Sequence, residues 1–169
     1  GTTVIAAGEQ MSAAASARPS DDGVKGGKVG IGASVALNLI TTTTTAQLDD
    51  GAVFLDGAGR EVGAASVIST ETEAEAGAAG GVAVDAVVAL ADLNETTTAR
   101  IGTGAALDMG GEVAIEASNE GENTATATGE AKAGSVGVGA AAAVIVGGGA
   151  KTGDLSNTSI TSATLARDV

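Results

Sequence analysis

The sequence predicts an all-β protein built as a right-handed parallel β-helix, a β-solenoid in which successive coils stack along one axis. Three observations lead to this prediction: an internal repeat at fixed spacing, apolar residues that alternate with a period of two, and a composition dominated by Gly, Ala, Thr and Val. A chain with such self-similarity stacks each repeat on its neighbours. We expect about six coils of about 26–27 residues each.

The repeat is clearest between residues 29–52 and 82–105. The first segment, VGIGASVALNLITTTTTAQLDDGA, aligns without a gap with the second, VAVDAVVALADLNETTTARIGTGA, and 11 of 24 positions are identical. A third copy opens at Val136 with VGVGAAAAVIV and then loses its similarity to the other two. Fixed spacing without gaps indicates units that are stacked in register.

The whole chain, residues 1–169, is expected to be a single solenoid segment. Its repeats are assigned to residues 29–81, 82–135 and 136–169, all approximate, with the last one partial. Residues 1–28 fit the tail of a preceding repeat, because TVIAA at Thr3–Ala7 resembles VAIEA at Val113–Ala117. We therefore expect the chain to be an internal piece of a longer protein.

Apolar side chains alternate along the first part of each copy, and alternate residues lie on one face of a strand. Stacked repeats would align them as columns directed into the core, for example Val29 with Val82 and Val136. A helix is disfavoured because Gly30 and Gly32 would each cost about 1 kcal/mol relative to Ala. The predicted core columns are Val29, Ile31, Val35, Leu37, Val82, Val84, Val88, Leu90, Val136, Val138 and Val144.

Threonine pairs recur at half the spacing of the repeat, and this half-period gives the predicted coil length. Long Thr runs favour strands, because branching at Cβ suits a pleated surface. Alternation directs Ala46 and Leu48 inward and their Thr neighbours outward. The outward hydroxyl and methyl groups either cover a solvated sheet or order water as an ice-binding surface. The predicted Thr face comprises Thr43, Thr45, Thr70, Thr72, Thr96, Thr98, Thr124, Thr126 and Thr152.

Gly-containing turns are predicted at residues 49–51 and 102–104, and a loop at residues 20–27. Several loop carboxylates offer oxygen atoms of the kind that Ca²⁺ prefers. Their density is lower than in a dedicated site, so we predict no metal site and at most weak calcium binding. These carboxylates are Asp21, Asp22, Asp49, Asp50 and Asp56.

The charge balance excludes several classes of partner. The net charge is −13, with 21 acidic and 8 basic residues, so the chain lacks the clustered basic face that nucleic-acid binding needs. The same charge repels anionic membranes. Residues 133–150 are uncharged, but they are rich in Gly and Ala and match the repeat, so no membrane span is expected.

The residue inventory predicts a protein that is not an enzyme. The chain contains no His and no Cys, which removes the commonest general base and the thiolate nucleophile. Glu71, Glu73 and Glu75 alternate along one predicted strand face, which is typical of a solvated surface. Neither a catalytic site nor a cofactor is predicted.

Three motifs occur together in the first copy: VGIGASVALN, then TTTTTAQL, then DGA. In this combination the chain resembles repeats of very large secreted bacterial adhesins and leukotoxin-type surface proteins. The resemblance covers residues 29–150 approximately, and it implies a parallel β-helix in a long passenger or stalk. The second copy departs from the pattern at Ala83, Asp85, Val87 and Ala91, and the third lacks the Thr run.

The expected function is structural: a stiff stalk or passenger segment of an exported bacterial surface protein, located outside the cell or on its surface. Expected partners are other copies or further repeats of the same protein, stacked end to end, and a host or abiotic surface. One alternative is a subunit that polymerises into an extracellular filament. The other alternative is a binding module whose Thr face contacts ice or another surface.

Overall fold

The computed structural model describes residues 2–19, 24–25, 27–53, 59–107, 110–147, 151–152, 155–156 and 159–167, and this part of the chain forms strands and no helix. The prediction of an all-β protein is confirmed. The strands are β1 (Thr2–Ala17), β2 (Val24–Lys25), β3 (Val29–Leu48), β4 (Gly59–Ile101), β5 (Val113–Val146), β6 (Lys151–Thr152), β7 (Leu155–Ser156) and β8 (Ser159–Leu165).

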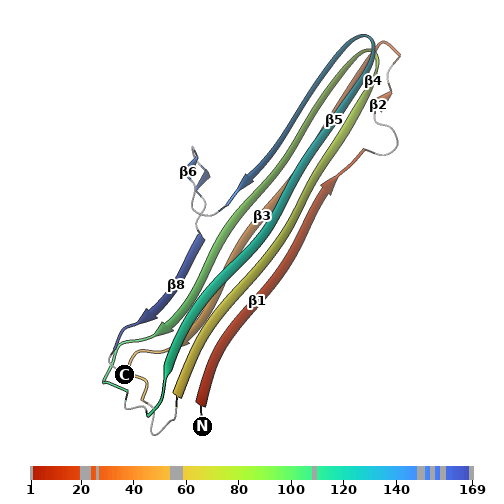
Figure 1. The fold of residues 1–169 in the computed structure, drawn as a ribbon. Coiled ribbons are helices and arrows are strands. Elements are labelled where there is room, and N and C mark those ends of the chain that lie inside the picture. Colours follow the sequence, from red (N-terminus) through yellow and green to blue (C-terminus); the bar gives the residue numbers. More distant parts are fainter. Residues whose placement is uncertain are drawn as a thin grey trace.

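Strand β4 lies at the centre of the main sheet. β1, β2, β3, β5 and β8 all pair with it in parallel, whereas the short β6 and β7 form a separate antiparallel pair. β4 and β5 both turn back at one end of the molecule (Figure 1). In β4 the turn falls at Gly80 and Gly81, where the pairing with β5 also shifts its register. We call residues 59–80 the ascending half of β4 and residues 82–101 its descending half.

The pairing register follows the long repeat. Val29 pairs with Val82, and Val82 pairs with Val136. The two similar segments Thr3–Ala7 and Val113–Ala117 flank the same segment of β4. Residues one half-period apart do not pair, because Thr45 pairs with Thr98 rather than with Thr72. The predicted coil of 26–27 residues and the count of six coils are therefore wrong. Each half-period is one straight run of strand. The chain completes two such runs, one in each layer, before it pairs with the preceding repeat.

Two layers of strand face each other across the core. The ascending layer contains β1, the ascending half of β4 and residues 113–133; the descending layer contains β3, the descending half of β4, residues 136–146 and β8. Far from the bend, Val62 packs with Leu48 and Ile101. Closer to the bend, the buried cluster consists of several alanines, among them Ala74, and a single valine, Val87. The core therefore becomes thinner as the two layers approach the bend.

The predicted core columns align as expected but lie on the opposite face of the sheet. The buried residues of β3 and of the descending half are those between the predicted ones, such as Ala36, Val87 and Ala89. The predicted Val35 is 68% exposed and its partner Val88 is 41% exposed. Val82 and Leu90 are half-buried. The remaining predicted core residues are exposed: Val29, Ile31, Leu37, Val84, Val136, Val138 and Val144.

Close approach of the two layers explains this reversed orientation. Gly30 and Gly32 occupy inward positions near the bend, and a Cβ atom on them would lie 2.2 Å from the Ala79 carbonyl oxygen and 2.5 Å from the Gly77 carbonyl oxygen. Such distances exclude any side chain. Because glycine is required on the inner face there, the intervening valines and isoleucine must point outward.

Candidate interaction surfaces

The Thr face predicted from sequence divides between the outside and the inside of the molecule. On the descending layer, Thr43 pairs with Thr96 and Thr45 pairs with Thr98. The β3 members are exposed and the β4 members are half-buried, so the four side chains form one small outer patch. On the other layer, Thr124 and Thr126 are exposed, but their partners are Glu71 and Glu73.

Thr70 and Thr72 are buried, so their predicted outward orientation is wrong. Their side chains are 3% and 0% exposed. In the ascending half of β4 the even-numbered residues face inward, whereas in the descending half the odd-numbered residues do so. The change of face at the bend separates Thr70 and Thr72 from Thr96 and Thr98. The Thr152 side chain lies outside the described residues.

The outer face of the ascending layer is acidic. Arg18 donates a hydrogen bond to Glu73, which raises the pKa of the guanidinium above its ordinary value, and it lies 3.7 Å from Glu75. Pairs this exposed contribute little to folding. The carboxylates on this face are Glu61, Glu71, Glu73, Glu75, Glu116, Glu120, Glu122 and Glu130. Most of these carboxylates are exposed to solvent.

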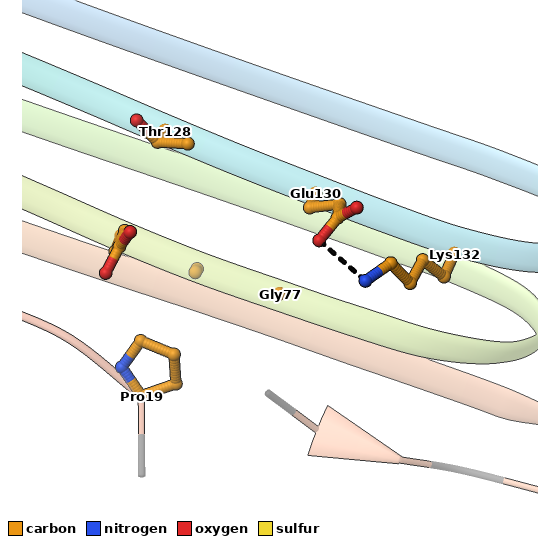
Figure 2. A pocket seen from close by; sticks show the side chains of 7 residues that line it. Pro19, Gly77, Thr128, Glu130 and Lys132 are labelled. Carbon is orange, nitrogen blue, oxygen red and sulfur yellow. Dashed lines mark ion pairs between the residues drawn. The ribbon is translucent and has the colours of Figure 1, made fainter. Parts of the chain in front are cut away.

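A shallow pocket lies on this acidic side (Figure 2). It occupies about 190 Å³ and is lined by Pro19, Glu75, Ala76, Gly77, Thr128, Glu130 and Lys132. The Lys132 Nζ lies 2.9 Å from a Glu130 carboxylate oxygen, so two of the charged groups at the pocket neutralise each other. Pockets that hold small molecules are larger, about 300–1,000 Å³, and mostly apolar. The pocket has neither property.

Stacked turns at the opposite end from the bend are joined by Arg167, which sequence reasoning did not identify. Its guanidinium donates to the carbonyl oxygens of Ala52 at 2.7 Å, Thr103 at 2.7 Å and Asp49 at 3.0 Å, and its Nε donates to Gly102. One buried side chain thus joins the turn after β3 to the turn after β4. The signal in the sequence is faint, because a lone arginine after a degenerate repeat has no pattern around it.

Asp50 lies in the same turns, and its carboxylate is hydrogen-bonded to the backbone of the facing turn. Its Oδ1 accepts a 2.7 Å hydrogen bond from the Thr103 amide, which lowers the pKa of the carboxyl below its ordinary value. Asp49 accepts a 2.8 Å bond from Gln47. Of the carboxylates considered for calcium, Asp21, Asp22 and Asp56 lie outside the described residues, and within the described part no group of three acidic, His or Cys residues is placed to hold a metal.

A band of polar side chains crosses the core and was not predicted from the sequence. Thr44 donates a 2.8 Å hydrogen bond to Glu9, and Asn119 donates one to Glu95; both bonds join the two layers. Thr70 donates a 2.7 Å bond to Asn123 within the ascending layer. The alternation of Thr42, Thr44, Glu95 and Thr97 at inward positions is the signal that would have revealed this band.

Nearer the bend, Asp85 is a buried carboxylate. It is 1% exposed, and neither of its oxygens has a hydrogen-bond partner among the described residues. A Cβ on Gly129 would lie 2.7 Å from its Oδ2, so the group fills the space that this glycine leaves. Gly32 and Gly139 occupy the equivalent position in the neighbouring strands.

The outer face of the descending layer is apolar near the bend. It consists of three aligned rows of alternating residues from β3, the descending half of β4 and β5. We call it the apolar face: Val29, Ile31, Ala33, Val35, Leu37, Val82, Val84, Ala86, Val88, Leu90, Val136, Val138, Ala140, Ala142 and Val144. Near the bend the two outer faces therefore differ in chemistry, because carboxylates gather on the ascending layer and the descending layer is apolar.

Comparison of the chain with protein-family models, with curated proteins and with solved structures finds no match. Among the described residues, no helix is long and apolar enough to cross a membrane. The resemblance to adhesin repeats stays a prediction.

Proposed function

We propose that this chain is a non-catalytic structural segment of an exported bacterial surface protein, a right-handed parallel β-helix that acts as a stiff stalk or passenger. One observation carries the proposal: the parallel register that aligns β3 with β4 continues from β4 to β5 at nearly the same spacing. A further repeat would pair with the free edge of β5 in the same way. The coil in this proposal is about 53 residues long, which is the spacing of the paired residues.

The long straight strands support a mechanical role. β3 has 20 residues, and β4 extends its pairing along both layers, so each added repeat forms many parallel backbone hydrogen bonds. In such repeat arrays each unit contacts mainly its neighbours, and the stability is about the sum of the contributions of the units and of the interfaces between them. The acidic outer face supports a soluble exported setting, and the sequence resemblance supports the bacterial surface.

A filament subunit is the second candidate, and the free edges favour it. β1 and β3 border one side of β4, and β5 and β8 border the other, so both ends of the stack are unpaired parallel edges within the described part of the chain. Unpaired edges are templates for another chain. The third candidate, an ice- or surface-binding face, has less support, because among the predicted threonines whose side chains the structure describes only Thr43, Thr45, Thr96 and Thr98 form a joint outer patch.

Electron microscopy of the purified chain across a concentration series, with circular dichroism, tests the proposal. A stalk segment gives short rods with a β spectrum whose length stays constant as the concentration rises. Long uniform filaments would replace it with the filament subunit. A helical or disordered spectrum would contradict both. Ice-shaping activity that is lost in Thr45→Lys/Thr98→Lys would instead favour the Thr patch.

A further inference from the structure

The apolar face is continuous and about as large as the largest apolar patch of a typical soluble molecule, a patch that often marks an interaction site. Val35, at 68%, and Ile31, at 64%, are among its most exposed side chains, and no charged residue occupies any of its positions. Three strands about 4.8 Å apart and nine residues at about 3.3 Å each give a projected area of roughly 400 Å². Soluble monomers rarely expose a continuous apolar patch above a few hundred Å². This face is therefore expected to be covered.

We propose that a second copy of this chain covers it, so that two molecules pack side by side with their apolar faces together. This pairing is lateral, and it is distinct from the end-to-end stacking of the proposed function, on which it does not depend. Two sheets that pack face to face lie about 10 Å apart, with their strands inclined by about 30°. A row of alternating Val, Ile, Leu and Ala presents the side-chain relief that such packing needs.

Area is the first argument for a second copy. When two such faces pair, about 1,000 Å² of surface in total is buried once the relief of the side chains is included, which is near the lower limit for a specific interface. The interface is isologous, with the same patch contributed by both partners. Ala86 lies at its centre, on the middle strand and in the middle row. A two-fold axis in the plane between the two faces, next to Ala86, brings the large residues on either side of it over one another.

Charge is the second argument. The acidic outer face is on the other layer, so lateral pairing keeps the carboxylates of the two copies on opposite outer sides. With a net charge of −13, any arrangement that brings the acidic faces together is repelled. A lipid surface fits this face less well, because interfacial segments use Trp and basic residues, whereas the chain has no Trp and the face has no Lys or Arg.

Sedimentation velocity of the purified chain from about 1 to 100 μM tests the pairing. The wild type is expected to form a dimer within this range, and Val35→Lys/Val88→Lys is expected to weaken it at least 100-fold. The matched control is Thr45→Lys/Thr98→Lys, a cross-strand pair on the same two strands and the same outer side. The control is expected to retain the dimer. Circular dichroism and thermal melting check that the folds are equal.

Should the lysine pair disturb folding, Val35→Thr/Val88→Thr keeps the shape and strand preference of the side chains and still weakens the dimer, by about 10-fold. A wild type that stays monomeric at 100 μM overturns the proposal. So does a dimer that survives the lysine pair, which would mean association through the strand edges. Flotation of a monomeric wild type with neutral phosphatidylcholine vesicles, abolished by Val35→Lys/Val88→Lys, would assign the face to lipid instead.

Discussion

The two halves of β4 have nearly the same length and the same strict alternation, but they expose different chemistry. The ascending half presents glutamates to solvent, and the descending half presents valines and then threonines. Their inner faces differ as well, with even-numbered residues buried in one half and odd-numbered residues in the other. The comparison shows that alternation identifies a strand, whereas the choice of the buried face depends on how closely the opposite layer approaches.

The largest expected effect is a difference in stability between substitutions at two neighbouring valines of the descending half. Val87 is 2% exposed and Val88 is 41% exposed. Val87→Asp places an unpaired carboxylate in the core, and we expect a loss of about 3 kcal/mol or more in the free energy of unfolding. Val88→Asp is expected to cost less than about 1 kcal/mol at protein concentrations low enough to keep the chain monomeric. Urea titration followed by circular dichroism measures both, and equal losses would contradict the assigned faces.

Two glycine substitutions, one in each layer, have the next largest expected effect on the free energy of unfolding. Gly30→Ala, on the strand next to the descending half, forces a Cβ to 2.2 Å from the Ala79 carbonyl oxygen. We expect it to cost about 2–3 kcal/mol, because backbone must move to admit the methyl group. Gly63→Ala, in the ascending half, meets no atom within 4 Å and is the control. It should be neutral or stabilising by about 0.5 kcal/mol. A tolerated Gly30→Ala would mean that the layers are further apart.

Removal of a buried carboxylate is expected to stabilise the descending half. Asp85 stands where Gly32 and Gly139 stand in the paired strands, and its oxygens have no partner among the described residues. Asp85→Ala should raise the free energy of unfolding by about 1–2 kcal/mol, because an unbonded buried polar group is unfavourable. Glu61→Ala, at an exposed position of the ascending half, should leave the melting temperature unchanged. A destabilised Asp85→Ala would imply a partner for this carboxylate.

Much of the fold follows from the sequence, and the errors have one physical origin. The ungapped alignment of residues 29–52 with 82–105 correctly gives the register of β3 against β4. It also places Ala46 and Leu48 in the core, where they are buried. The same reasoning put Val35 inside, which requires a change of face within β3, but β3 keeps a single alternation along its length. The hydrophobicity of the valines predicted that they would be buried. The short distance between the layers at Gly30 instead requires glycine on the inner face, so the valines point outward.

The candidate surfaces were less predictable, because they depend on contacts between residues far apart in sequence. The acidic alternation of Glu71, Glu73 and Glu75 was visible, and so was the outer Thr patch at Thr43 and Thr45. The half-period of the Thr pairs was real as a spacing but misleading as a coil length, since its two members lie on opposite layers. No local pattern indicates that Arg167 reaches Asp49 and Ala52, more than a hundred residues earlier.

The smallest expected effect concerns the turns that join the two layers at the end opposite the bend. The hydrogen bond from the Thr103 amide lowers the pKa of Asp50 below its ordinary value of 3.8. A carboxyl whose pKa is lower in the folded state stabilises the fold above its unfolded pKa, and this contribution is lost as the pH falls through the folded pKa. Melting temperatures between pH 6 and pH 2 should therefore decline below about pH 4, and less steeply in Asp50→Asn than in the wild type. Identical profiles for the wild type and Asp50→Asn would show that the bond between Asp50 and Thr103 does not hold the stacked turns together in solution.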